Sequence, residues 1–152
     1  MLRIPTTVVT ETLNALQESG SRRHEGIVIW LGHRFGDDTE VIEPHHPVHV
    51  ARIDMFHIPP AGMRKLQERL RQSRMFVVAQ VHSHPAKAFH SEADDRWAIV
   101  RHVGALSLVL PDFGLKTTPA SFLQDVKVFR LNEANSWLEV PHAEVKSTWS
   151  LT

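Results

Sequence analysis

The feature that most constrains this chain is a short apolar run that ends in two closely spaced histidines. Residues 75–81 are mostly apolar and rich in β-branched side chains, a pattern that predicts a buried β-strand. His82 and His84 follow directly. Because side chains alternate between the two faces of a strand, both imidazoles are expected on the same side of its end. Such a pair presents two nitrogen ligands to one metal ion.

A carboxylate lies ten residues after the second histidine. Asp94 closes the tetrad Ser91-Glu92-Ala93-Asp94 and would give the two histidines a third partner. Three protein ligands are what a catalytic zinc site uses while one position stays open for water. The neighbouring Asp95 is the alternative third ligand. The tetrad also fits a helix N-terminus, with Ser91 as the N-cap and an acidic residue three positions later, and the two interpretations are compatible.

The string His82-Ser83-His84-Pro85, followed by this tetrad, resembles the motif of the JAMM (MPN-plus, Jab-type) metallopeptidases, stand-alone prokaryotic type. The family pattern is His-x-His, a short spacer, Ser-x-x-Asp, and a catalytic glutamate well upstream. Here six residues separate His84 from Ser91, one fewer than is usual in the family. The resemblance covers residues 25–110. It implies the JAMM/MPN fold, which is related to the cytidine-deaminase-like architecture.

The resemblance also implies an activity and the residues that perform it. The family hydrolyses isopeptide or peptide bonds after the C-terminus of ubiquitin or ubiquitin-like proteins, in deconjugation or precursor processing. Zn²⁺ would be held by His82, His84 and Asp94, Glu25 would be the general base, and Ser91 would donate a hydrogen bond to the oxyanion. The expected partners are a ubiquitin-like protein or its conjugates, together with activating and conjugating enzymes of the same system, such as a bacterial antiphage system.

Other functions remain open beside this one. A JAMM-type peptidase could act on other peptides or small conjugates, and a non-catalytic MPN scaffold could share the fold. A serine hydrolase built on Ser83 or Ser91 would need a nucleophile elbow, and the sequence has no Gly-x-Ser-x-Gly. A zinc nucleobase deaminase normally needs a pair of cysteines, and this chain has none.

Glu25 is singled out by its position rather than by its type. It stands before a second apolar run, residues 27–31, which predicts a strand covered on both faces and followed by Gly32. Taken alone, a glutamate at a strand end is most simply a solvated carboxylate. The resemblance favours the catalytic role, because the family places its catalytic glutamate at the start of such an early strand.

Composition limits the class of protein. At 152 residues the chain is expected to form one domain, residues 1–152. Lys plus Arg and Asp plus Glu both number 17, which argues against nucleic acid or an anionic membrane as the main partner. The absence of cysteine excludes disulfides and thiolate zinc sites and favours a cytoplasmic location. No apolar run approaches membrane-spanning length, and residues 1–5 do not begin a signal peptide.

The remaining patterns predict an α/β fold, a mixed central β-sheet flanked by helices. One helix is expected at residues 6–19, with a threonine cap and Gly20 as its end, and another at residues 61–73, after two prolines. A third helix is expected after the metal motif, with Ala93, Trp97 and Val100 buried and its end near His102. Further strands are expected at 41–53, 105–110, 126–131 and 137–140, the last two as a hairpin, with a helical turn within 117–125. The tail from Pro141 predicts no element.

Four other histidines lie in or near the 41–53 segment. His45, His46, His49 and His57 lack a carboxylate at ligand spacing. They are therefore interpreted as surface or substrate-facing residues.

Overall fold

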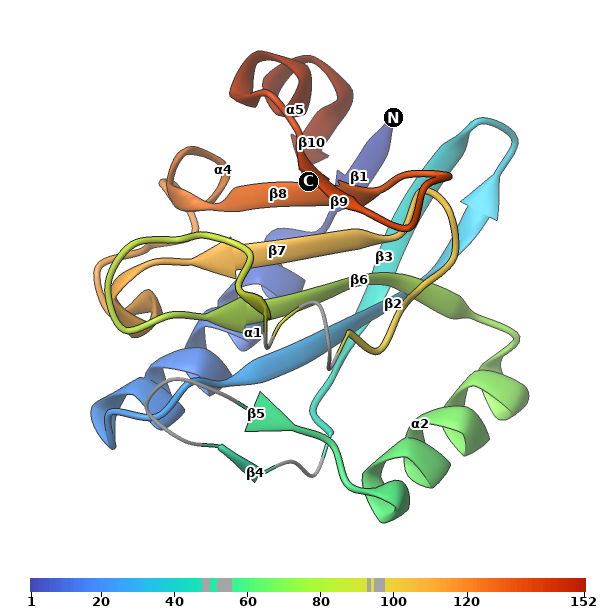
Figure 1. Cartoon of the computed structure of the whole chain (residues 1–152). Helices are drawn as coiled ribbons and strands as arrows, with labels where there is room; N and C mark the ends of the chain where they lie inside the picture. Colours follow the sequence, from blue (N-terminus) through green and yellow to red (C-terminus); the bar gives the residue numbers. More distant parts are fainter. Residues whose placement is uncertain (48–49, 52–55, 93, 95–97) are drawn as a thin grey trace.

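The computed structural model describes residues 1–47, 50–51, 56–92, 94 and 98–152, and its centre is an eight-stranded sheet (Figure 1). The strand order is β10-β1-β3-β2-β6-β7-β8-β9. The strands are β1 (Leu2–Ile4), β2 (Ile27–Phe35), β3 (Asp38–His45), β6 (Phe76–Ser83), β7 (Leu106–Leu110), β8 (Lys127–Leu131), β9 (Trp137–Glu139) and β10 (Trp149–Leu151), with β4 (Val50–Ala51) and β5 (Phe56–His57) as a separate pair. The helical elements are α1 (Thr6–Ser21), α2 (Pro60–Ser73), η1 (Asp112–Gly114), α4 (Phe122–Asp125) and α5 (His142–Thr148).

The sheet is mixed, as the sequence predicts. β6 lies at its centre, antiparallel to β2 on one side and parallel to β7 on the other. β8 and β9 continue from β7 as the expected antiparallel hairpin. The prediction of a mixed α/β sheet flanked by helices is therefore confirmed, and β6 carries the histidine motif at its C-terminal end.

The α1 helix covers one face of the sheet. Its predicted apolar face is buried, with Val9, Leu13 and Leu16 no more than 3% exposed. Opposite them lies Trp30 of β2, which is 0% exposed, and its indole N–H donates to Thr12 Oγ1 at 2.8 Å. The polar atoms in this layer are thus paired, which is the condition for burying them at little cost.

The other face of the sheet packs against α2. Ile27, Ile29 and Leu31 alternate with the α1-facing residues of β2 and form a separate apolar cluster with Leu66 of α2. Both sets of β2 side chains are buried, which explains why this strand is continuously apolar in sequence. His82 pairs with Ile27 in register, so its side chain shares the α2-facing side.

The expected start of α1 at Thr6 is confirmed, but its expected cap and its expected end are wrong. Gly20 does not end the helix, which continues to Ser21. A Cβ at Gly20 would lie 2.6 Å from Phe113 Cβ, so this glycine allows the helix to pack closely against η1. No threonine caps the start, since Pro5 precedes the helix and Thr6 Oγ1 donates to the Thr152 carbonyl at 3.0 Å.

The predicted helix after the metal motif does not reach its expected end near His102. Glu92 and Asp94 are helical, but residues 98–102 are not. Val100 is nevertheless buried, at 4% exposed. The Ile99 backbone N–H donates to the Gln80 Oε1 atom at 3.0 Å. A side chain of β6 therefore accepts the hydrogen bond that a backbone carbonyl would accept in a helix. Ala93 and Trp97, which the prediction used, lie outside the described residues.

The 41–53 segment and the C-terminal tail differ from expectation as well. β3 begins earlier, at Asp38, and ends at His45, with Pro44 inside it. Residues 48–49 and 52–53 lie outside the described residues. The tail forms α5 and β10, and β10 pairs in parallel with β1, so that the two ends of the chain lie side by side (Figure 1). Within the described residues, no helix combines the length and apolar character needed to span a membrane.

Candidate metal centre

The two motif histidines lie at the C-terminal end of β6. His82 is 0% exposed and His84 is 2% exposed, and their ring centroids are 5.2 Å apart. The His84 N–H donates to the Leu110 carbonyl at 2.9 Å, and the Phe113 N–H donates to the His84 carbonyl at 2.7 Å. The ends of β7 and η1 therefore hold the backbone of His84 in place. Both imidazoles are presented together, as strand alternation predicts.

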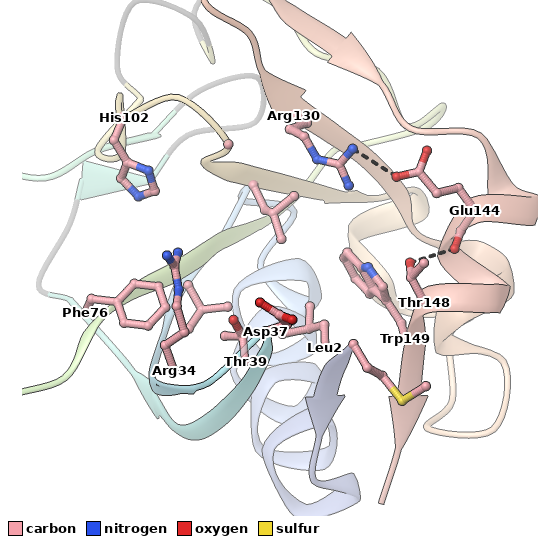
Figure 2. A pocket seen from close by; sticks show the side chains of 14 residues that line it. Leu2, Arg34, Asp37, Thr39, Phe76, His102, Arg130, Glu144, Thr148 and Trp149 are labelled. Carbon is pink, nitrogen blue, oxygen red and sulfur yellow. Dashed lines mark hydrogen bonds and ion pairs between the residues drawn. The ribbon is translucent and has the colours of Figure 1, made fainter.

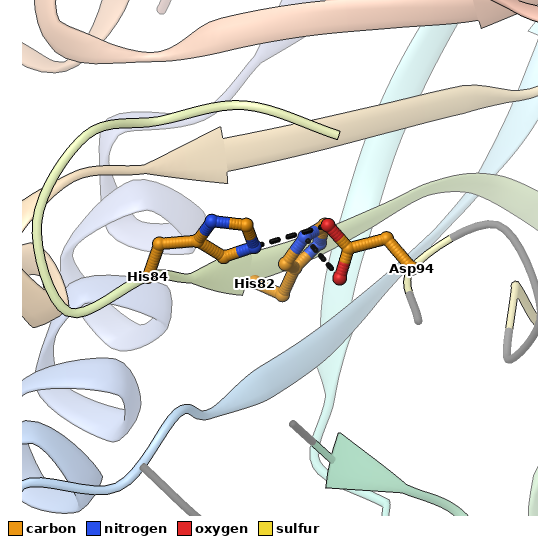
Figure 3. A group of neighbouring side chains, drawn as sticks. All are labelled: His82, His84 and Asp94. Carbon is orange, nitrogen blue, oxygen red and sulfur yellow. Dashed lines mark hydrogen bonds and ion pairs between the residues drawn. The ribbon is translucent and has the colours of Figure 1, made fainter. Parts of the chain in front are cut away.

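Asp94 lies against both imidazoles (Figure 3). Its Oδ1 is 3.2 Å from His82 Nε2, and its Oδ2 is 3.0 Å from His84 Nε2. The Ser91 N–H donates to Asp94 Oδ2 at 2.8 Å, and the Asp94 N–H donates to Ser91 Oγ at 3.0 Å. This reciprocal pair is the predicted N-terminal capping arrangement, and it aims the carboxylate at the histidines.

The three side chains form a group that could hold a metal ion. One ligand atom from each of His82, His84 and Asp94 lies within 4.8 Å of the other two, and all three residues are buried. Two imidazole nitrogens and one carboxylate oxygen are a donor set that Zn²⁺ accepts. Taking three such groups out of water is costly for stability, which favours a functional reason for the cluster. Asp95, the alternative ligand, lies outside the described residues.

The environment of Asp94 favours its ionised form. Burial alone would raise the pKa of this carboxyl. Hydrogen bonds to His82 and His84 and the backbone N–H of Ser91 outweigh burial, so the pKa lies far below its ordinary value. A carboxylate that stays ionised is the form that binds a cation.

Glu25 lies beside the histidine end of β6. It is 2% exposed, which excludes the solvated strand-end interpretation. The next residue, Gly26, donates its N–H to Ser83 Oγ at 3.0 Å, and the Ser83 N–H donates to the Gly26 carbonyl at 3.2 Å. Ile27 then pairs with His82. The backbone at Glu25 is thus fixed next to the cluster, and the described group of three potential ligands does not include this residue.

The hydroxyl of Ser91 can serve two purposes. In its capping role the oxygen accepts the Asp94 N–H and does not use its own proton. Within the described residues no acceptor takes that proton. The hydroxyl therefore caps the helix as an acceptor and remains available as a donor toward the site.

Some residues around the site were not predicted. Ser83 locks the Glu25 segment to β6, and Gln80 fixes the chain after Asp94 by accepting from Ile99 while donating to Ser107 Oγ at 3.0 Å. His90 packs its ring 4.9 Å from Trp137 and 5.3 Å from Phe129, centroid to centroid. Gln80 could have been noticed in the sequence, because it is a polar residue within an apolar strand. Nothing in the local sequence signals the contacts of His90, because they join segments far apart in the chain.

The four histidines set aside in the sequence do not join the cluster as far as the structure describes them. His45 is half-buried at the end of β3, and His46 is exposed. His49 lies outside the described residues. The described part of the chain contains one group of three potential ligands, and it is His82, His84 and Asp94.

Comparison with known proteins gives a family. The model of the prokaryotic homologs of the JAB domain matches residues 11–113, which include all five candidate site residues. The chain belongs to this family. A relative in Sinorhizobium fredii (strain NBRC 101917 / NGR234), named "Probable metalloprotease y4jG", is 30% identical over 98% of this chain and 93% of its own length.

The fold of this JAB-family chain is also found in a solved structure. The solution structure of protein DSY2949 from Desulfitobacterium hafniense superposes with a TM-score of 0.67 at 17% sequence identity. The match covers 100% of this chain and 93% of the other. The likeness concerns the arrangement of the whole sheet and its helices.

Proposed function

We propose that this JAB-family protein is a zinc-dependent peptidase that cleaves the bond after the C-terminus of a ubiquitin-like protein. The observation that carries the proposal is the buried His82, His84 and Asp94 group with Glu25 fixed beside it. The name of the Sinorhizobium fredii relative supports the metalloprotease class. The isopeptidase character and the ubiquitin-like substrate are supported by the resemblance of the motif to the JAMM enzymes.

The proposed ligands are the Nε2 atoms of His82 and His84 and the carboxylate of Asp94. A bound zinc ion would supply Lewis acidity, which lowers the pKa of water and polarises a carbonyl group. The chain supplies the position of the ligands through strand β6 and the capping pair of Ser91 and Asp94.

Glu25 and Ser91 would handle the proton and the developing charge. The Glu25 carboxylate would accept a proton from the attacking water and deliver it to the leaving amine. Its burial shields it from competing solvent. The Ser91 hydroxyl would donate to the oxyanion, and removal of a comparable donor costs about 2.7–4 kcal/mol of transition-state stabilisation.

The substrate side of the proposal follows from the same resemblance. An extended C-terminal tail ending in small residues would enter the site, and the linked protein or peptide would leave as the amine. The partners would be a ubiquitin-like protein or its conjugates and the activating and conjugating enzymes of that system, in the cytoplasm. Nucleic acid and membranes are not among the proposed partners.

The proposal is tested with the full chain loaded with zinc and a set of ubiquitin-like proteins. Each is offered as an isopeptide conjugate and as a linear fusion, with and without chelator. The expected result is cleavage directly after the C-terminal tail, lost with chelator and restored by added zinc. Cleavage that survives complete metal removal contradicts the metallopeptidase class. Cleavage of unrelated peptides alone contradicts the ubiquitin-like specificity, and zinc binding without any cleavage indicates a scaffold.

A further inference from the structure

A second feature lies directly beside the candidate metal centre. A hollow of about 360 Å³ lies between residues 90–92 and the β8–β9 hairpin. One wall is formed by His90, Ser91 and Glu92, and the other by Phe129, Asn135 and Trp137. Because Ser91 borders both the hollow and the ligand group, a molecule bound in the hollow would lie next to the reacting bond.

The walls of this hollow are held in place by packing and hydrogen bonds. The His90 ring contacts Trp137 and Phe129, which ties the segment before Ser91 to the hairpin. The hairpin turn is closed by the Ser136 N–H, which donates to Asn132 Oδ1 at 2.9 Å, and by the Asn132 N–H, which donates to the Ser136 carbonyl at 3.0 Å. The hollow is therefore formed before any ligand binds, which reduces the entropic cost of binding.

The chemistry of the lining suits a positive charge. Glu92 is exposed and brings a carboxylate, and the described lining residues include no lysine or arginine. Trp137 brings the aromatic ring that attracts cations most strongly. The Arg101 Nη1 atom lies 3.5 Å from Oδ1 of the lining residue Asn135, but Arg101 itself does not line the hollow.

We propose that this hollow is a subsite for a lysine or arginine side chain of the substrate, adjacent to the scissile bond. Glu92 would pair with the charged head, and Trp137 would pack on the aliphatic stem. The inference rests on the proposed peptidase function and adds a charge preference to it. The hairpin lies outside residues 11–113, so the subsite is built partly from a segment beyond the part that the family model matches.

The first test measures cleavage of paired peptides by the zinc-loaded chain. The peptides share one tail and carry lysine, norleucine or glutamate in turn at each position flanking the bond. At one of these positions the wild-type protein is expected to prefer lysine to norleucine by about two- to fivefold in kcat/KM, the effect of one solvent-exposed charge contact. The difference should appear mainly in KM and should shrink in high salt.

Substitutions in the hollow then decide the question. Glu92→Gln should bring the lysine-to-norleucine ratio close to one, and Glu92→Lys should reverse the preference toward glutamate. The matched control is Glu133→Gln. Glu133 is an exposed residue in the turn between β8 and β9 that does not line the hollow, so this variant should keep the wild-type ratio. A wild-type ratio in Glu92→Gln, or an equal loss in Glu133→Gln, overturns the proposal.

A binding measurement separates this subsite from the peptidase activity. Nα-acetyl-lysine amide and Nα-acetyl-norleucine amide are titrated into the protein while the Trp137 indole N–H resonance is followed by NMR. A shift caused by the lysine compound, reduced in Glu92→Gln, supports the subsite even if no peptide is cleaved. Equal shifts with both compounds overturn it, whereas a failure of cleavage alone contradicts only the proposed function.

Discussion

The two faces of the central sheet bury different kinds of side chain. Under α1 the buried layer is apolar, and its polar atoms are paired, as Trp30 and Thr12 show. On the α2 side, the apolar cluster around Leu66 gives way at the end of β6 to His82, His84 and Asp94. The first layer supplies stability, whereas the second costs stability and is expected to supply chemistry. Substitutions on each face of the sheet should therefore affect stability and activity separately.

The largest effect is expected at Glu25. Glu25→Gln keeps the shape of the side chain but removes the base, so kcat should fall about 10²–10⁴-fold, the usual contribution of such a group. Zinc content and the midpoint of thermal unfolding should change little. Glu11→Gln, an exposed residue on α1, is the matched control. Near-full activity in Glu25→Gln contradicts the assignment of the base.

A substitution on the α1 side of the sheet should change the stability of the protein and leave its activity unchanged. Leu16, on the buried face of α1, is 0% exposed, and Leu16→Ala should lower the free energy of unfolding by about 2–5 kcal/mol because it leaves a cavity. Urea unfolding measures the loss. The kcat/KM of the remaining folded protein should match the wild type. A tenfold fall in that value shows that the two faces are not independent.

Metal binding should stabilise the fold through the polar cluster. With free zinc at about 100 times the dissociation constant, the free energy of unfolding should rise by about 2.7 kcal/mol. Thermal unfolding with and without zinc measures the change. His84→Ala should abolish this rise. In Leu16→Ala, zinc should give the same rise, although the free energy of unfolding without zinc is lower than in the wild type. An equal rise in His84→Ala indicates that zinc binds elsewhere.

The smallest effect concerns an ion pair between β3 and α2. Glu43 accepts two hydrogen bonds from Arg69, at 2.6 and 2.7 Å, and this contact lowers the pKa of Glu43. Because both side chains are partly exposed and screened by water, their coupling should not exceed about 1 kcal/mol. A double-mutant cycle with Glu43→Gln and Arg69→Ala measures it.

The pH dependence of this pair follows from the direction of the pKa shift. A carboxyl with a lowered pKa in the folded protein contributes stability above its unfolded pKa, about 4.3. The coupling should therefore be complete at pH 7 and disappear as the pH falls through the lowered pKa. A coupling that grows in acid contradicts the assignment.

Most of the fold could be predicted because long or strongly patterned segments dominate it. The apolar strands β2 and β6 and the helix α2 have periodicities that local sequence determines. The three-residue strands β1 and β10 are too short for any pattern, and they exist because the two ends of the chain pair with each other. Likewise, residues 98–102 are not part of a helix as their sequence predicts, because the Gln80 side chain accepts the Ile99 N–H.

The candidate site could be predicted where the residues are close in sequence. The His-x-His motif and the capping tetrad are local, and the structure brings both to one point. The burial of Glu25 depends on Gly26 pairing with Ser83, which lies 57 residues away. The contacts of His90 depend on a hairpin that follows much later in the chain. Such distant pairings are set by tertiary packing, which no local pattern records.

The opposite end of the sheet is also hollowed. A cavity of about 260 Å³ lies there, and its lining includes Arg34, Arg130 and Trp149 (Figure 2). Arg130 is paired with Glu144 at 2.9 Å, and the Arg34 guanidinium lies 5.4 Å from the centroid of the Phe76 ring. These contacts engage both arginines, and none of the residues that line this cavity belongs to the group of three that could hold a metal ion.

The most direct test of the account is the zinc content of the purified chain, measured by native mass spectrometry. The wild type should bind one zinc ion, and binding should be lost in His84→Ala and in Asp94→Ala while Asp95→Ala retains it. Retention of zinc by Asp94→Ala, or its loss in Asp95→Ala, would contradict the proposed ligand set.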